Sequence, residues 1–194
     1  MKNIRLIMIN EDLSRHSPIP LQPGFKFRFF QDGDQETWAE IEAQAQEFPN
    51  IEAARARFQQ EFRKQRKELS KRCFFLLDPA GKPVGTAMGW YGSSQFEGLL
   101  YGRLHWIAII PSYQSLGLGR PLISQAVEVL KQFHKKAFLV TRPRNYRAIR
   151  IYLDFGFKPH LTAKEQHRGW RQVEEILKTA ILSAAPCSSR EGGE

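Results

Sequence analysis

The sequence has little of what disulfide-rich or zinc-binding proteins need. Its 194 residues include only two cysteines, Cys73 and Cys187, which lie far apart and in unlike surroundings. This arrangement argues against a disulfide framework, and neither a CxxC pair nor closely spaced histidines indicate a zinc site. We therefore expect a functional site without a metal ion.

Long hydrophobic runs are absent as well. Residues 4–9 form an apolar stretch near the start, but Arg5 interrupts it and no small-residue cleavage site follows. A membrane span needs roughly 18 uninterrupted apolar residues, and nothing in the chain approaches that length. We therefore expect a cytoplasmic protein with no membrane partner.

Negative charge is also scarce, because 20 acidic residues face 29 Lys and Arg residues and leave a net charge of +9. Such an excess favours anionic partners: nucleic acid, acidic protein, a membrane surface or a phosphorylated cofactor. Residues 52–72 concentrate many of these cations in a segment expected to be helical. A charge run of this kind is typical of a solvated helix face, although docking to RNA or to a cofactor phosphate stays open.

The composition otherwise suits a packed protein, since 42% of the residues are hydrophobic and 12% are aromatic. The patterning predicts a short strand near residues 5–9 and then alternating strands and helices. Strands are expected at residues 25–30, 73–77, 83–90, 103–110, 137–141 and 157–160. Helices are expected at residues 34–47, 50–70, 119–134, 145–154 and 164–183.

This order of elements predicts the α/β class, with a mixed central sheet flanked by helices and an extra C-terminal helix. We expect a single domain over residues 25–185. A lead-in at residues 1–24 precedes it, and a disordered tail at residues 186–194 follows it.

A loop between a buried strand and a helix carries the strongest chemical signal. It comprises Gln114, Ser115, Leu116, Gly117, Leu118, Gly119 and Arg120. Two glycines spaced by one residue let the backbone approach a ligand closely, and the helix start supplies unpaired N–H groups and a positive dipole end. The segment therefore predicts an anion site, to which Arg120 adds charge. A turn merely tightened by glycines is equally compatible with this context.

Two familiar phosphate-binding loops fit this segment poorly. A Walker A loop needs Gly-Lys-Ser/Thr, whereas Arg120-Pro121 stands in that place. A dinucleotide fingerprint needs a small residue where Leu122 stands and an acidic residue where the next strand ends in Thr141-Arg142.

A second pattern lies about 30 residues downstream, where Asn145 begins a short helix that carries Tyr152 and ends at Gly156-Phe157. Together with the loop, this resembles the GNAT superfamily of acyl-CoA-dependent N-acetyltransferases. The shared signature is a strand ending before a proline, a Q/R-x-x-G-x-G/A loop that opens a helix, and then N…Y…GF. The resemblance covers residues 25–160 in element order and residues 103–157 in motif detail.

The resemblance implies roles for individual residues. The amides of residues 114–120 would hold the CoA pyrophosphate, and Asn145 would contact the cofactor near the second helix. The backbone of Ile109 and Ile110 would pair with the pantetheine arm, and one of these N–H groups would polarise the thioester carbonyl. Acetyl-CoA would then serve as cosubstrate, and its acetyl group would pass to a primary amine by direct attack in a ternary complex.

The resemblance also suggests an acid and a base. Tyr152 matches the tyrosine that protonates the departing thiolate, which a phenol with a pKa of about 10 can do. Relatives often use a strand carboxylate as base, but residues 103–110 contain neither Asp nor Glu. His105 is the candidate base on this strand and Glu97 the reserve, while a structural role for His105 stays open.

Other features leave the acceptor undefined. Trp38, Trp90, Trp106 and Trp170 either line an acceptor pocket or fill the core. Residues after Phe157 show little strand character, where the family usually adds two strands. The family is compatible with a homodimer. A non-catalytic module on the same fold, binding CoA or nucleic acid, is the alternative function, although no aromatic-interleaved nucleic-acid motif supports RNA.

Overall fold

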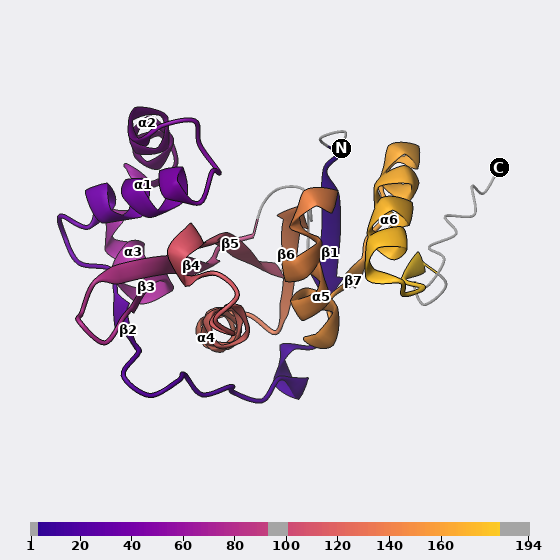
Figure 1. Ribbon diagram of the computed structural model, residues 1–194, viewed down its shortest axis with the longest axis horizontal. Helices are drawn as coiled ribbons and strands as arrows, with labels where there is room; N and C mark the ends of the chain where they lie inside the picture. The colour runs from indigo at the N-terminus through magenta and orange to yellow at the C-terminus, as the bar shows by residue number, and fades with distance from the viewer. Residues whose placement is uncertain (1–3, 93–100, 183–194) are drawn as a thin grey trace. The chain divides into compact units, whose positions relative to one another are not determined.

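A computed structural model describes residues 4–92 and 101–182 of the chain. These residues form a mixed α/β structure with seven strands, labelled in Figure 1, which confirms the predicted class. Two compact units are present: Glu11–Leu139 makes up the larger one, and Met1–Asn10 together with Val140–Glu194 makes up the smaller one.

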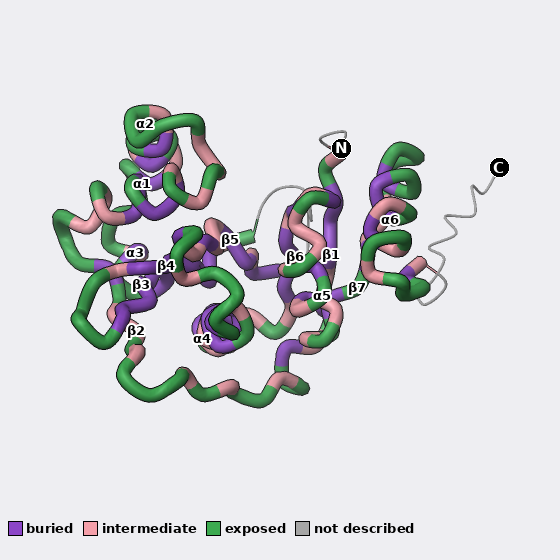
Figure 2. Tube along the Cα trace, in the orientation of Figure 1, coloured by how far each residue is buried: buried purple, intermediate pink, exposed green. Residues whose placement is uncertain are grey.

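The larger unit is built on a mixed sheet. Its strands lie in the order β2 (Lys26–Phe29), β3 (Cys73–Leu77), β4 (Pro83–Trp90), β5 (Tyr101–Ile109) and β6 (Lys136–Thr141), the last of which leads into the smaller unit. Neighbours from β2 to β5 pair antiparallel, whereas β5 and β6 pair parallel. Figure 2 shows buried residues along β3 and β4, as expected for strands in the middle of a sheet.

Helices cover both faces of this sheet. Before β3 the chain forms α1 (Gln35–Gln44), α2 (Ile51–Phe62) and α3 (Arg66–Arg72), and after β5 it forms α4 (Gly119–Lys131). Figure 1 shows α1 and α2 on one side of β4 and β5 and α4 on the other. A long crossover helix is what a parallel β5–β6 connection requires.

The glycines of β4 and β5 allow α4 to approach the sheet closely. A Cβ atom added at Gly89 would lie 2.8 Å from the Val129 Cγ1 atom, so a side chain there would displace the helix. Trp90, the next residue of β4, points to the opposite face and packs edge-on against Phe62 of α2 at 4.9 Å between ring centroids.

An aromatic cluster fills the space between α1, α2 and the sheet. Trp38 and Phe62 at its centre are fully buried. Around them lie Phe48, Phe58, Trp90 and Trp106. Trp38, Trp90 and, in the smaller unit, Trp170 are therefore core residues, and only Trp106 among the four tryptophans is half-buried.

Several helix boundaries differ from the sequence-based expectation. The helix expected at residues 50–70 is divided, because α2 ends at Phe62 and α3 begins at Arg66. The break lets Phe62 and Leu69 both reach the core. Asn50 caps α2 by accepting a hydrogen bond from the Ala53 N–H at 2.8 Å. Asp34 makes no such cap, since its carboxylate is held by Arg28 at 2.7 Å.

The smaller unit combines the two ends of the chain. It contains β1 (Leu6–Asn10), α5 (Tyr146–Asp154), β7 (Lys158–Pro159) and α6 (Lys164–Leu177). The short strand expected near residues 5–9 is thus present, and it pairs antiparallel with β7. The last strand has only two residues and is followed by α6, in keeping with the weak strand character after Phe157.

Candidate functional site

The loop before α4 has the backbone geometry of an anion cradle. After β5 the chain makes one 3-10 turn, η3 (Pro111–Tyr113), and then enters residues 114–118. Ser115 and Gly117 adopt positive φ angles of 64° and 77°, with right-handed or extended residues beside them. Such alternation turns successive N–H groups toward the same side, which creates a concave site for negative charge.

The amides of this loop are available to a ligand. Leu116 and Gly117 are exposed, whereas Leu118 is buried and anchors the start of α4. Within the described ranges, the N–H groups of residues 115–119 have no acceptor. They stand at the N-terminus of a 13-residue helix, whose dipole favours an anion there.

Two glutamine side chains hold the loop in this shape. Gln22 donates from Nε2 to the Leu116 carbonyl at 2.6 Å. Gln114 donates from Nε2 to the Ile109 carbonyl at 2.8 Å. Both bonds engage carbonyl oxygens and leave the loop N–H groups unoccupied, so the loop is organised before any ligand arrives.

The backbone N–H groups of Ile109 and Ile110, both expected to contact the cofactor, differ in their hydrogen bonding. The Ile110 N–H donates to the Val84 carbonyl at 2.9 Å and is therefore taken by the sheet. Ile109 stands opposite Gly85 in the antiparallel pair. Because N–H groups alternate in direction along a strand, the Ile109 N–H points away from β4.

The β5–β6 pairing leaves this second edge of β5 partly uncovered. The parallel register runs from Tyr101 opposite Lys136 to Leu104 opposite Leu139. β5 continues to Ile109 beyond the last of these pairs. The edge that carries the Ile109 N–H therefore has the form that an extended ligand arm can pair with.

A β-bulge in β5 brings two neighbouring side chains to one face. Between β4 and β5 the register shifts near Trp106, whose φ is 45°. Two residues then oppose one, so the side chains of His105 and Trp106 both point toward α2 instead of alternating. Their rings lie 4.8 Å apart between centroids.

Both side chains meet the carboxylate of Glu61 on α2. His105 Nε2 forms a short hydrogen bond with Glu61 Oε1, and Trp106 Nε1 donates to Oε2 at 3.3 Å. Arg57, one helical turn earlier, donates from Nε to the same carboxylate at 2.9 Å. The side chain of Glu61 is 17% exposed and that of His105 only 5%, so Glu61 is the member of the pair nearer to solvent.

Burial and charge set the protonation of this pair. Burial lowers the pKa of His105 to about 4, even though the hydrogen bond to Glu61 opposes this change. Burial alone would raise the pKa of Glu61, but the hydrogen bond from His105 and the charges of Arg57 and Arg103 lower it to about 2. At neutral pH the pair is therefore a carboxylate accepting a hydrogen bond from a neutral imidazole.

Asn145 and Tyr152 lie in the smaller unit. Asn145 ends the short turn η4 (Pro143–Asn145) and immediately precedes α5. Tyr152 is a buried residue of α5 whose ring packs edge-on against Phe157 at 6.2 Å. Gly156, with a φ of 81°, reverses the chain after the helix, as its place in the sequence motif suggests.

The predicted site residues thus fall into two groups. The loop, Ile109 and His105 belong to the larger unit, and Asn145 and Tyr152 belong to the smaller one. The reserve base Glu97 and the tail at residues 186–194 lie outside the described residues. Sequence reasoning missed Glu61, which is 44 positions from His105 and carries no local signal of the contact.

The described residues contain neither a metal-binding cluster nor a membrane-spanning helix. Within residues 4–92 and 101–182, no group of three or more His, Cys, Asp or Glu side chains is arranged to hold a metal ion. No helix in the same part of the chain is both long and apolar enough to cross a bilayer.

Comparison with known proteins connects this geometry to one family. The model of the acetyltransferase (GNAT) family matches residues 34–157. An uncharacterised N-acetyltransferase of Methanocaldococcus jannaschii is 32% identical over 106 residues, which are 53% of this chain and 45% of the relative. An N-alpha-acetyltransferase of Sulfurisphaera tokodaii is 29% identical over 93 residues, 44% of this chain and 56% of the relative. The chain thus spans about half the length of the curated relatives that it matches.

Solved structures share the fold. A GCN5-related N-acetyltransferase from Sphaerobacter thermophilus superposes with a TM-score of 0.61 at 17% identity, covering 82% of this chain and 50% of that one. A GNAT-family acetyltransferase from Colwellia psychrerythraea gives a TM-score of 0.60 at 13% identity, covering 81% and 53%. At these identities the likeness concerns the fold alone.

The protonation of His105 predicts how stability depends on pH. The unfolded chain protonates this histidine near its ordinary pKa of 6.5, whereas the folded chain does so only near 4. The contribution of the neutral His105 side chain to the free energy of unfolding is therefore present above pH 6.5 and is lost as pH falls toward 4. Replacing His105 by Gln should make the drop in unfolding free energy between pH 7 and pH 5 smaller by about 2 kcal/mol.

Urea unfolding at several pH values measures this difference. His167→Gln is the matched control, because His167 is an exposed histidine on α6. An identical pH dependence in wild type and His105→Gln would show that His105 is protonated in the folded protein as easily as in the unfolded one.

Proposed function

Because this chain belongs to the GNAT family of acetyltransferases, we propose that it transfers the acetyl group of acetyl-CoA to a primary amine by direct attack in a ternary complex. One observation carries the proposal furthest: within the part of the chain that the structure describes, the N–H groups of residues 115–119 have no acceptor, and the loop is exposed at Leu116 and Gly117. A pyrophosphate matches them in charge and in its number of acceptor oxygens.

The cofactor would extend from this loop along β5. The pyrophosphate would accept hydrogen bonds from the N–H groups of residues 115–119, beside the side chain of Arg120. The pantetheine arm would pair with the uncovered edge of β5. Ile109, rather than Ile110, would then supply the N–H that stabilises the developing oxyanion, because the Ile110 amide is bonded to Val84.

The departing thiolate needs a proton, and Tyr152 is our candidate donor. A phenol and a thiol have similar acidities, so transfer between them needs little driving force. Asn145 would contact the cofactor from its place just before α5. Both roles follow from the match of Asn145, Tyr152 and Gly156-Phe157 to the family motif.

The attacking amine must lose a proton, and we propose that the Glu61–His105 pair receives it. Burial makes His105 a weak base even beside Glu61, and the hydrogen bond to Glu61 raises its pKa above that of a histidine buried without such a partner. The Glu61 carboxylate is partly exposed and ionised, so it can attract an ammonium group and stabilise a proton on the imidazole.

The acceptor class can be narrowed by one relative. The Sulfurisphaera tokodaii protein is named an N-alpha-acetyltransferase, which supports the α-amine of a peptide as the first acceptor to test. A turnover assay with acetyl-CoA against peptides, free amino acids, lysine side chains and small amines would rank these classes directly.

Placing a negative side chain in the loop should weaken cofactor binding. In Gly117→Glu, a carboxylate would stand beside the proposed pyrophosphate, and the positive φ would strain the backbone. We expect the affinity for acetyl-CoA, measured by isothermal titration calorimetry, to fall more than about tenfold, which is about 1.4 kcal/mol.

Gly81→Glu is the control for this experiment. Gly81 also has a positive φ, 84°, and a Cβ atom there would meet no neighbour within 4 Å. Equal affinities of the two variants for acetyl-CoA would contradict the assignment of the loop.

Removing the hydroxyl of Tyr152 should slow the chemical step without weakening cofactor binding. We expect Tyr152→Phe to lower kcat by about 10²-fold, since general acids typically contribute that much to the rate. The affinity for acetyl-CoA should stay within about twofold of the wild-type value, because the hydroxyl acts only in the chemical step. Tyr146→Phe, on the same helix, is the matched control. An unchanged kcat in Tyr152→Phe would remove it as the acid.

A further inference from the structure

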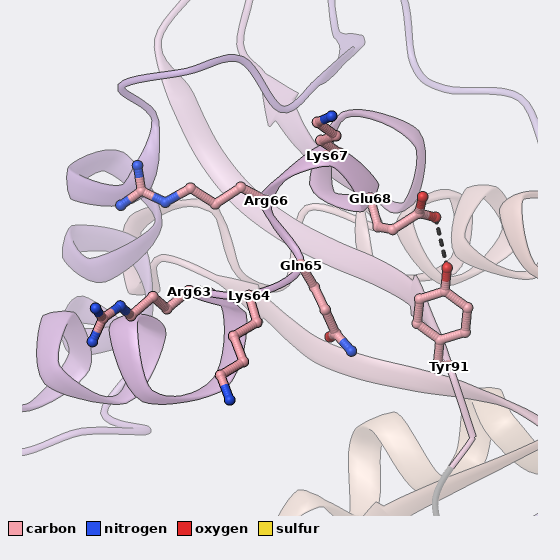
Figure 3. A pocket seen from close by; sticks show the side chains of 7 residues that line it. All are labelled: Arg63, Lys64, Gln65, Arg66, Lys67, Glu68 and Tyr91. Carbon is pink, nitrogen blue, oxygen red and sulfur yellow. Dashed lines mark hydrogen bonds between the residues drawn. The ribbon is translucent and has the colours of Figure 1, made fainter.

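A basic turn, residues 63–67, runs from the end of α2 into the first residues of α3 and borders a pocket. Four of its five residues, 63–67, are cationic, and all five are exposed. The pocket is open, has a volume of about 480 Å³, and is lined by Arg63, Lys64, Gln65, Arg66, Lys67, Glu68 and Tyr91. In the view of Figure 3 the Arg63 and Arg66 side chains extend to the same side of the turn.

The positive charge of this turn is not cancelled from within the described chain. Arg63, Lys64 and Lys67 make no ion pair there, and Arg66 reaches only the Gln59 amide oxygen, at 3.5 Å. The one acidic residue of the lining, Glu68, is already engaged elsewhere. It pairs with Arg72 at 3.2 Å and Lys71 at 3.7 Å, and it accepts a hydrogen bond from the Tyr91 hydroxyl at 2.8 Å (Figure 3).

Neighbouring arginines behave differently. Arg28 pairs with Asp34 at 2.7 Å, Arg55 with Glu36 at 2.7 Å, and Arg57 with Glu61 at 2.9 Å. Among the described residues, these three arginines therefore have carboxylate partners, whereas the four cations of the turn have none. Clustered cations without counter-charges repel one another, and an external anion relieves that repulsion.

The far wall of the pocket is fixed by a buried arginine. Arg72 is 3% exposed and its guanidinium lies 3.9 Å from the Tyr91 ring centroid and 3.8 Å from that of Phe133. It also donates to the Gly89 carbonyl at 3.4 Å. The Tyr91 ring is thus covered on one face, and its hydroxyl is occupied.

This wall helps to identify the chemistry of the ligand. Single-stranded nucleic acids bind to basic grooves that also offer aromatic faces for stacking bases. Among the described residues that line this pocket, Tyr91 is the only aromatic one, and it is held by Arg72 and Glu68. Carboxylates need no stacking surface, and exposed arginines bind them with paired N–H groups.

We propose that the pocket between α2, α3 and Tyr91 is a docking site for an acidic peptide segment, whose carboxylates pair with Arg63, Lys64, Arg66 and Lys67. This site is separate from the loop before α4. It does not depend on acetyl transfer, so each assignment can fail without the other.

A fluorescein-labelled hexaglutamate peptide is the probe, with binding followed by fluorescence anisotropy. We expect saturable binding to the wild type that weakens as salt rises. The variant Lys64→Glu/Lys67→Glu should bind about tenfold more weakly, which is about 1.4 kcal/mol, because both exposed charges then repel the peptide. Far-UV circular dichroism and the urea midpoint verify that the variant is folded.

The control variant is Lys82→Glu/Lys135→Glu, which makes the same change in net charge at exposed positions outside the pocket. Binding that survives in the control but not in the pocket variant supports the proposal. Equal losses in both variants would mean attraction to the overall positive charge and would overturn it. Tighter binding of a hexameric oligoadenylate, lost in the pocket variant, would overturn it in favour of RNA.

Discussion

The proposed binding of a diphosphate depends on a single backbone constraint, the direction of the amides between β5 and α4. Positive φ angles at Ser115 and Gly117 turn these N–H groups outward, and burial of Leu118 fixes the point where the helix begins. Gln22 and Gln114 occupy carbonyls of the same region without using its amides. A ligand entering this loop therefore meets donors that are already oriented, so little ordering entropy is lost on binding.

The register of β5, the strand before the loop, is irregular at Trp106 and regular near its end, and each part positions different groups. The bulge at Trp106 presents His105 and Trp106 together to Glu61, while the regular pairing near its end fixes which amide faces outward. A strand without the bulge would place one of these two side chains on the α4 face. One strand, β5, thus carries both the residues proposed to act on the acceptor amine and the amide proposed to contact the cofactor.

The sequence reveals features that arise from local signals. The glycine spacing predicts the loop, and the patterning of residues 119–134 predicts α4. At residue 34, where a helix is expected to begin, the Asp34 carboxylate bonds to Arg28, six residues earlier, instead of capping α1.

Contacts between distant segments leave no comparable trace in the sequence. Glu61 and His105 are 44 residues apart, and only the packing of α2 on the sheet brings them together. The division of the helix expected at residues 50–70 occurs without a glycine or proline, since it serves the burial of Phe62 and Leu69. The basic pocket follows from that break, so its existence was equally hidden.

Amide hydrogen exchange of the wild-type protein, with and without saturating CoA, tests the central claim most directly. The account predicts that the amides of residues 115–119 become protected when CoA is bound, while the amides of the β3–β4 turn around Gly81 exchange as before. CoA binding that leaves the exchange of residues 115–119 unchanged would contradict it.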